Sequence, residues 1–321
     1  MNAGVIFKMK KMLFLINPNA GQRKVARVLP EILTIFQEGG YEVTTFVTTG
    51  PGSGIPIVES RAAAYDLIVC AGGDGTLNET ISGVLRSGAD RPIGYIPCGS
   101  TNDFAATLKL STDMLQAARD ILMGTDQLYD LGIFNDRYFS YVASFGAFTR
   151  VSYATPQNLK NVLGHLAYVL GGIQELTQIR KIPMTLDLDG ETVEGEYIFG
   201  AVSNSTSVGG VITLNPQHVD LRDGKFEVTL VRMPKDMTEV GACVQALQTQ
   251  NYDCEPITFR SVSTLTIRQS PDVVWTLDGE RAEGAEVIRF ENLHRAFRLR
   301  HRQEKPLKTR PSATSPGGIR C

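Results

Sequence analysis

Apolar runs and helix-like stretches alternate along the first part of the chain. The run Met12–Ile16 ends at an Asn-Pro-Asn-Ala-Gly sequence, and 25–36 then has apolar residues at helical spacing. Tyr41–Thr48 and Asp66–Ala71 are rich in β-branched and apolar residues, which predicts two further strands. Because strands alternate with polar loops and helices, the pattern predicts a parallel sheet with helices on both faces.

The same rhythm continues further along the chain. Pro92–Ile96 predicts another strand, and helices are expected through Leu85 and from the segment 98–104 onward. This gives a Rossmann-like α/β domain, to which we assign residues 1–138. The short segment 295–300 is expected to return to this domain.

The pattern changes after residue 138. Residues 139–294 contain short alternating strands with Asp-Gly turns, and helices are expected only at 156–176 and 235–250. This predicts a second domain that is a mainly antiparallel β-sandwich or barrel. The remaining residues, 301–321, hold three prolines and several basic residues against a single acid, which predicts a disordered basic tail.

The composition is that of a globular protein with two domains. The 321 residues are 42% hydrophobic and 21% charged, with a net charge of −2. Because the positive and negative charges nearly balance, a dedicated nucleic-acid binder is disfavoured. Five cysteines without CxxC spacing disfavour a zinc knuckle or a disulfide framework and fit a reducing cytosol. No apolar run approaches the roughly 20 residues of a membrane-spanning helix, so we expect only surface contact with membranes.

A glycine-rich loop, Gly72-Gly73-Asp74-Gly75-Thr76, lies between a predicted strand and a predicted helix. Its glycines allow backbone N–H groups to approach phosphate oxygens, and the helix N-terminus adds a favourable dipole. A carboxylate beside phosphates repels them unless Mg²⁺ lies between, so Asp74 predicts a metal-bound nucleotide. The loop lacks the Lys-Ser/Thr ending of a Walker A sequence.

Two more polar loops, 17–21 and 99–103, follow strands of the same predicted sheet. Each alone is ordinary, since Asn, Pro and Gly are common loop formers. Ligands bind outside the carboxyl ends of parallel strands, where these loops would meet the glycine-rich loop. Their convergence predicts a nucleotide-phosphate site.

Four short sequences are distinctive as a set. They are NPNAG at 17–21, GGDGTLNE at 72–79, GSTNDF at 99–104 and YDLG at 129–132. The set resembles the diacylglycerol kinase catalytic-domain family, and most closely its soluble Gram-positive bacterial members. GGDGT also occurs in NAD kinases and 6-phosphofructokinases, whereas Asn78-Glu79 and the later Asn-Asp-Phe resemble the lipid kinase branch.

The resemblance implies a site for ATP and its Mg²⁺. The matching positions are Asn17, Pro18, Asn19, Ala20, Gly21, Thr48, Gly72, Gly73, Asp74, Gly75, Thr76, Leu77, Asn78, Ser100, Asn102, Asp103 and Asp130. Of these, Asp74, Asp103 and Asp130 match carboxylates around the nucleotide-bound Mg²⁺. Close relatives have a Lys after the first loop, but Gln22 stands here, followed by two basic residues.

The resemblance also implies an acidic catalytic segment and a second metal site. Asp278 and Glu280 lie in a Leu-Asp-Gly-Glu sequence that matches the segment whose carboxylate deprotonates the acceptor hydroxyl. The same tetrapeptide occurs at 188–191, so the choice of the later copy depends on the order of motifs in the family, and either carboxylate is a candidate base. The positions that match a structural Mg²⁺ site, partly through backbone carbonyls, are Asp220, Asp223 and Lys225.

The function implied is that of an ATP-dependent lipid kinase, which phosphorylates the free hydroxyl of 1,2-diacylglycerol to give phosphatidic acid. Alternatives are a kinase of another lipid hydroxyl, such as phosphatidylglycerol or a sphingoid base, a NAD kinase, and a nucleotide-binding regulator without turnover. The resemblance implies a cytoplasmic protein, peripheral at the inner face of the membrane, which contacts its lipid substrate transiently and forms a homodimer. No nucleic-acid partner is expected.

Overall fold

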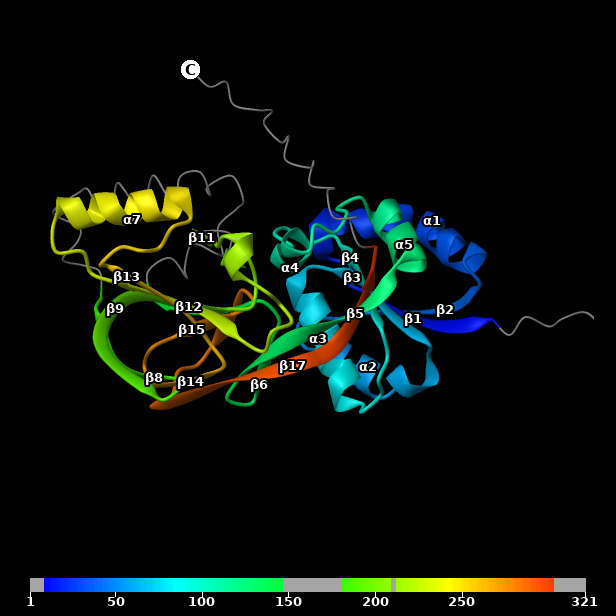
Figure 1. Cartoon of the computed structure of the whole chain (residues 1–321). Helices are drawn as coiled ribbons and strands as arrows, with labels where there is room; N and C mark the ends of the chain where they lie inside the picture. Colours follow the sequence, from blue (N-terminus) through cyan, green and yellow to red (C-terminus); the bar gives the residue numbers. More distant parts are fainter. Residues whose placement is uncertain (1–8, 147–179, 209–211, 303–321) are drawn as a thin grey trace, which may run out of the picture.

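The first half of the structure is built on a parallel sheet. The computed structural model describes residues 9–146, 180–208 and 212–302 (Figure 1). Four parallel strands lie in the order β4-β3-β1-β2. They are β1 (Lys10–Ile16), β2 (Tyr41–Val47), β3 (Leu67–Gly72) and β4 (Ile93–Pro97). Every residue of β3 and β4 is buried, as expected for central strands of a sheet that is covered on both faces.

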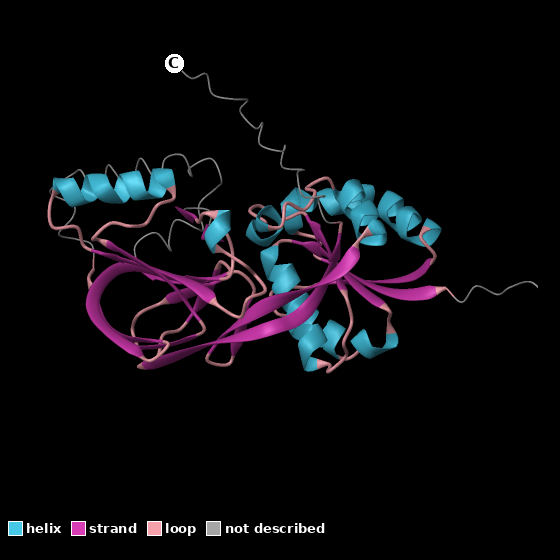
Figure 2. Ribbon diagram, in the orientation of Figure 1, coloured by secondary structure: helices cyan, strands magenta, loops and turns pink. Residues whose placement is uncertain are grey.

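Helices cover both faces of this sheet, since β1 alternates its side chains between two cores (Figure 2). Phe14 packs against Phe36 of α1, whereas Leu13 and Leu15 belong to the cluster that contains Leu77 of α3. The helices are α1 (Lys24–Glu38), α2 (Gly54–Glu59), α3 (Asp74–Arg86), α4 (Asp103–Thr107) and α5 (Met114–Met123), with 3₁₀ turns η1 (Ala20–Arg23) and η2 (Ala62–Ala64).

The second half is a mostly antiparallel β region with one described α-helix, α7 (Met237–Thr249). Trp275 is fully buried in its core and packs against Phe145 and Phe290. The strands are β5 (Thr125–Phe134), β6 (Arg137–Phe139), β7 (Val142–Gly146), β8 (Ile182–Leu188), β9 (Glu191–Ser203), β12 (Phe226–Arg232), β13 (Ile257–Val262), β14 (Thr264–Gln269), β15 (Trp275–Leu277), β16 (Glu280–Ala282) and β17 (Val287–His301). A separate ladder joins β10 (Ser207–Val208) to β11 (Ile212–Thr213), and a 3₁₀ turn η6 (Pro216–His218) follows it.

The strand β17 links the two halves, together with β5 (Figure 1). It pairs antiparallel with β14 and β5, and Leu299 near its end pairs in parallel with Ile93 of β4. A register shift lies between Leu293 and Phe297, where the sequence pattern suggests a change from the second domain to the returning segment. Hydrogen bonding therefore continues from the antiparallel region into the parallel sheet.

The predicted fold class is confirmed, and the elements lie within a few residues of the expected bounds. The stretch 25–36 lies inside α1, the strand expected at 66–71 is β3, and 235–250 contains α7. The helix expected at 156–176 and nearly all of the tail 301–321 lie outside the described residues. In the part of the chain that the structure describes, no helix has the length and apolar character needed to cross a membrane.

Candidate active site

Three loops meet at the carboxyl edge of the parallel sheet, as the sequence pattern predicts. They follow β1, β3 and β4 and comprise residues 17–21, 72–76 and 98–103. Their backbones touch at glycines. A Cβ atom on Gly21, whose φ is +56°, would lie 2.1 Å from the carbonyl oxygen of Cys98. A Cβ atom on Gly99 would lie 2.5 Å from the Cα of Gly73. A side chain at either position would force the loops apart, so the convergence requires glycine there.

The three loops surround a cavity of about 390 Å³, here called the phosphate cavity. The helix α3 begins beside it at Asp74, and the first N–H groups of an α-helix have no acceptor within the helix. Asn17 joins two of the loops by donating from Nδ2 to Thr76 Oγ1 over 3.2 Å. The predicted residues that line the cavity are Asn17, Asn19, Ala20, Gly21, Thr48, Gly73, Gly75, Thr76 and Ser100. Pro18 and Gly72 belong to the same loops but do not line it.

Asp74 is a buried carboxylate beside this cavity. Its Oδ2 accepts the N–H of Asp103 at 3.0 Å and its Oδ1 accepts that of Phe104 at 3.2 Å, so it caps the N-terminus of α4. Burial, and next the nearby charge of Asp103, raise the pKa of Asp74 to about 7. A cation between the two carboxylates would relieve their repulsion.

The two aspartates therefore fit a Mg²⁺ ion that arrives with a nucleotide. Among the described residues, no group of three or more His, Cys, Asp or Glu side chains is placed to hold a metal ion. Mg²⁺ is commonly bound through one or two carboxylates together with substrate phosphates and water. Asp74 and Asp103 supply such a pair next to the loops that would hold the phosphates.

Asp278 connects the second half of the molecule to the site through five hydrogen bonds. Its carboxylate accepts three consecutive backbone N–H groups, those of residues 140–142, and the hydroxyl of Ser140. The fifth donor is Nδ2 of Asn78 in α3, at 2.8 Å. Burial raises the pKa of Asp278, and these donors oppose the shift. A carboxylate with five donors has little capacity left for another, so Asp278 is suited to hold the turn in place.

The other Leu-Asp-Gly-Glu sequence, at 188–191, has the same local structure as the one that contains Asp278. Both copies form two-residue turns between paired strands, with Asp189 at φ +51° and Asp278 at φ +48°. Asp189 accepts the backbone N–H groups of Ser263 and Thr264, and its own N–H donates to the Thr264 carbonyl. Asp278 makes the same exchange with Val142. The aspartate of this tetrapeptide fastens its turn to a neighbouring strand in both places.

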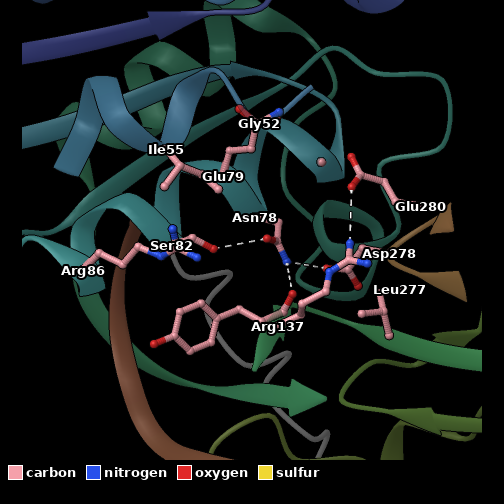
Figure 3. Close-up of a pocket in the computed structure, with 12 residues that line it drawn as sticks. Gly52, Ile55, Asn78, Glu79, Ser82, Arg86, Arg137, Leu277, Asp278 and Glu280 are labelled. Carbon is pink, nitrogen blue, oxygen red and sulfur yellow. Dashed lines mark hydrogen bonds and ion pairs between the residues drawn. The ribbon is translucent and has the colours of Figure 1, made fainter. Parts of the chain in front are cut away.

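Glu280 is placed differently from its counterpart in the other copy. Its side chain is 53% exposed, and in the described part of the chain its carboxylate accepts no hydrogen bond. A Cβ on Gly75 would lie 3.5 Å from Glu280 Oε1. Glu280 lines both the phosphate cavity and a neighbouring cavity of about 210 Å³, here called the side cavity (Figure 3). Burial, and next the charge of Glu79, raise the pKa of Glu280, as suits a group that accepts a proton.

Two residues outside the predicted set also shape the site. Glu79 accepts the N–H groups of Gly52 and Gly54 at 2.8 and 2.7 Å, which holds the loop after β2 against α3. Arg137 Nη2 lies 3.8 Å from Glu280 Oε2 (Figure 3). Glu79 is part of the sequence pattern that marks the lipid kinase branch, so its position was a usable signal. No sequence pattern around Arg137 indicates a role at the site, because its partner Glu280 lies far along the chain.

Three predicted residues lie near the phosphate cavity without lining it. Leu77 is fully buried in the core beneath α3, so its side chain is out of reach of a nucleotide. The Asn78 amide donates to Asp278 and to a backbone carbonyl, which uses both of its N–H groups. Asn102, at φ +56°, folds its own loop by exchanging hydrogen bonds with Gly99.

Asp130 is not brought to the phosphate cavity either. Its fully buried carboxylate accepts the N–H groups of Gly224 at 2.6 Å and Arg295 at 2.7 Å. His294 Nδ1 lies 3.0 Å from the same carboxylate. These contacts fasten the loop 220–225 to β17, so in this arrangement Asp130 does not reach a metal at the nucleotide.

In that loop, one oxygen of each carboxylate of the predicted structural Mg²⁺ site accepts hydrogen bonds. Asp220 Oδ1 accepts them from Arg222. Asp223 Oδ1 accepts the N–H of Lys225, whose carbonyl accepts from Asn292. A metal ion at these residues stays a prediction, and we assign no step to an ion there.

Comparison with known proteins covers nearly the whole chain. Residues 11–133 match the diacylglycerol kinase catalytic domain, and residues 142–299 match the YegS C-terminal NAD kinase beta sandwich-like domain. A diacylglycerol kinase from Bacillus subtilis (strain 168) is 31% identical over 299 residues, covering 92% of this chain and 98% of that protein. One from Staphylococcus saprophyticus is 30% identical over 273 residues, covering 84% and 89%. The solved structure of a diacylglycerol kinase from Bacillus anthracis str. Sterne has the same fold, with a TM-score of 0.71 at 21% identity over 92% of this chain and 97% of that one.

Proposed function

Because the chain belongs to the diacylglycerol kinase family and is a kinase, we propose that it transfers the γ-phosphoryl group of ATP to the free hydroxyl of 1,2-diacylglycerol, giving ADP and phosphatidic acid. The observation that carries the proposal is the position of Glu280, a half-exposed carboxylate that lines both the phosphate cavity and the side cavity. In-line transfer needs the donor and the acceptor on opposite sides of the moving phosphoryl group, and a carboxylate at the acceptor hydroxyl.

In this mechanism the glycine-rich loops hold the phosphates of ATP, and the acceptor hydroxyl approaches from the side cavity. Glu280 takes the hydroxyl proton as the bond from the acceptor oxygen to the γ-phosphorus forms. The bond from that phosphorus to the bridging oxygen breaks, and its electron pair leaves with ADP. Mg²⁺, when bound with ATP near Asp74 and Asp103, would neutralise part of the phosphate charge. Asp278 acts through position, by holding the turn that carries Glu280 against α3.

The test is a mixed-micelle kinase assay with Mg²⁺, γ-labelled ATP and 1,2-diacylglycerol, applied to wild type and to Glu280→Gln. We expect a loss of about 10²–10⁴-fold in kcat, the usual contribution of a general base, with ATP affinity within about twofold of wild type. The matched control is Glu191→Gln, which makes the same change in the other Leu-Asp-Gly-Glu turn. Equal activities of the two variants would show that Glu280 is not the base.

The same assay separates diacylglycerol from the other acceptors. Phosphatidylglycerol, a sphingoid base and NAD⁺ are offered in parallel, and the labelled product is identified in each case. Label in phosphatidic acid supports the proposed substrate. Label only in another lipid, or only in NADP⁺, would replace it while leaving the kinase activity in place.

We propose further that the protein meets this lipid at the cytoplasmic membrane surface and does so transiently. If basic residues make the contact, binding to anionic vesicles weakens as salt rises, because surface charge is screened over about 10 Å at 0.1 M salt. Salt-independent binding would point to insertion of apolar side chains instead. The homodimer expected from the resemblance stays a prediction, which analytical ultracentrifugation would test.

A further inference from the structure

The side cavity has a charge pattern that a neutral alcohol does not explain. It shares Gly75, Glu79 and Glu280 with the phosphate cavity, so the two adjoin at the proposed base. Its walls come from α3, α2 and the loop after β2 on one side, and from β6 and the β15–β16 turn on the other (Figure 3). Two guanidinium groups line it, those of Arg86 at the end of α3 and Arg137 in β6.

The carboxylates in the same walls do not account for these cations. Glu79 is held by two backbone N–H groups, and Asp278 has five donors. Glu280 is 3.8 Å from Arg137, a separation too long for a good hydrogen bond. Within the described residues Arg86 has no ion pair or hydrogen bond, and Arg137 donates only to the carbonyl of Arg281. Most of the N–H donors of both guanidinium groups are therefore available to a ligand.

A diacylglycerol molecule carries no charge for these groups to bind, but its phosphorylated product does. On transfer, the phosphoryl group leaves ATP, with ADP as the leaving group, and joins the acceptor oxygen. It thereby moves from the phosphate cavity to the side of Glu280 where the arginines lie. The product is a phosphomonoester with a charge of about −1.5 to −2, which the carboxylates of Glu79 and Glu280 repel. Two guanidinium groups offset that repulsion, and their paired N–H donors can form bidentate hydrogen bonds with phosphate oxygens.

We propose that Arg86 and Arg137 form a phosphomonoester subsite on the acceptor side of Glu280, which binds the transferred phosphoryl group. This proposal rests on the proposed function for the direction of transfer. Arg137 moves from its long contact with Glu280 to the phosphate as the phosphate arrives. Arg86, at the end of α3, supplies the second guanidinium group. The ligand class is a lipid phosphomonoester, with a phosphodiester lipid as the weaker binder because it carries one charge.

The experiment measures binding without ATP, so that it does not depend on turnover. Neutral phosphatidylcholine vesicles are prepared with equal fractions of phosphatidic acid or phosphatidylglycerol, and wild-type protein is titrated against each. The variants are Arg86→Gln, Arg137→Gln and the double variant, with Arg86→Lys and Arg137→Lys as conservative replacements. Arg260→Gln removes one exposed positive charge from β13, outside the side cavity, and controls for net charge. ATP affinity is measured for every variant as a check of folding.

Wild type should prefer phosphatidic acid, and each Gln variant should lose about tenfold in affinity for it, the size of one charge-assisted contact. The Lys variants should recover part of the loss, and Arg260→Gln should stay within about twofold of wild type. Unchanged phosphatidic acid binding in the double variant overturns the proposal. Equal losses toward both lipids also overturn it, since they indicate general surface charge. If diacylglycerol is not phosphorylated but phosphatidic acid binding still depends on both arginines, the proposed function fails and the subsite stands.

Discussion

Replacement of Asp278 by Asn distinguishes a residue that holds a turn from one that exchanges a proton. Asn has nearly the same shape as Asp, but it substitutes an NH₂ group for one carboxylate oxygen. In the folded protein three donors point at Oδ2 and two at Oδ1, all from buried or half-buried groups. Whichever way the amide turns, its NH₂ group faces two N–H groups, with which it makes no hydrogen bond, whereas the Ser140 hydroxyl can rotate and accept from it.

The expected cost follows from the number of donors left without an acceptor. A buried donor that loses its partner costs about 1–3 kcal/mol, so two such donors give a destabilisation of about 2–6 kcal/mol. For a domain of 150–250 residues, 1 kcal/mol shifts Tm by about 2–4 °C, so Tm should fall by about 4 °C or more. Because Asn78 is among the donors, the contact between α3 and the β15–β16 turn weakens as well, and kcat should fall with it.

The matched control is Asp189→Asn in the other Leu-Asp-Gly-Glu turn. Asp189 has the same left-handed φ and the same exchange with a neighbouring strand, but it is exposed. Water can take over the hydrogen bonds that it loses, so Tm should change by less than about 2 °C and kcat should not change. Tm is measured by differential scanning calorimetry, and kcat by the mixed-micelle assay. If Asp278→Asn melts like wild type but loses more than about 10³-fold in kcat, Asp278 is the base and does not have a mainly structural role.

Three further changes have defined outcomes. Gly21→Ala places a Cβ against the Cys98 carbonyl, so ATP affinity, measured by calorimetric titration, should fall at least tenfold. The control is Gly40→Ala, at φ +84° with open space around its Cα. It imposes similar backbone strain without the clash, so its ATP affinity should match that of wild type. Burial raises the pKa of Glu227 to about 8, above its unfolded value near 4.5. Its contribution to the free energy of unfolding is therefore complete below pH 4.5 and is lost as pH rises toward 8, by about 1 kcal/mol per pH unit. Glu227→Gln should flatten the dependence of Tm on pH, and a slope parallel to that of wild type would refute this. The pKa of Asp74 is about 7, so its carboxylate ionises between pH 6 and pH 8. The increase in ATP affinity on adding Mg²⁺ should therefore be larger at pH 8 than at pH 6. In Asp74→Asn this increase should be the same at both pH values, and EDTA should abolish it in both proteins.

The parallel sheet and its three loops could be predicted because they depend on residues that are close in sequence. Each strand is a short apolar run, and each loop has the glycines that let it approach its neighbours. Leu77 shows the limit of motif matching. It falls inside the glycine-rich motif, yet Ile81 and Val84 place its side chain on the buried face of α3 by helical spacing. The periodicity was in the sequence and carried more information on Leu77 than the motif did.

The contacts between the two halves could not be predicted in the same way. Asn78 and Asp278 are 200 residues apart, and their hydrogen bond depends on how β15 is placed against α3. Asp130 was expected near the nucleotide because a short motif contains it, but the pairing of β5 with β17 sets it beside the loop 220–225. Pairing of this kind is decided by the whole sheet, and no local pattern of residues reports it.

The two Leu-Asp-Gly-Glu turns show why the tetrapeptide alone does not indicate function. Both turns have the same backbone, and both aspartates accept N–H groups from the next strand. The difference lies in what the fold puts opposite each turn. Asp278 faces α3, from which Asn78 adds a fifth donor, and Glu280 then lies at the boundary of two cavities beside Gly75. The first copy lies between β8 and β9 and lines neither the phosphate cavity nor the side cavity. It therefore has the structural role of the aspartate without the proposed chemical role of the glutamate. The glutamate gains its proposed role from the neighbouring helix and loops, so the order of motifs along the chain distinguishes the two turns and the tetrapeptide alone does not.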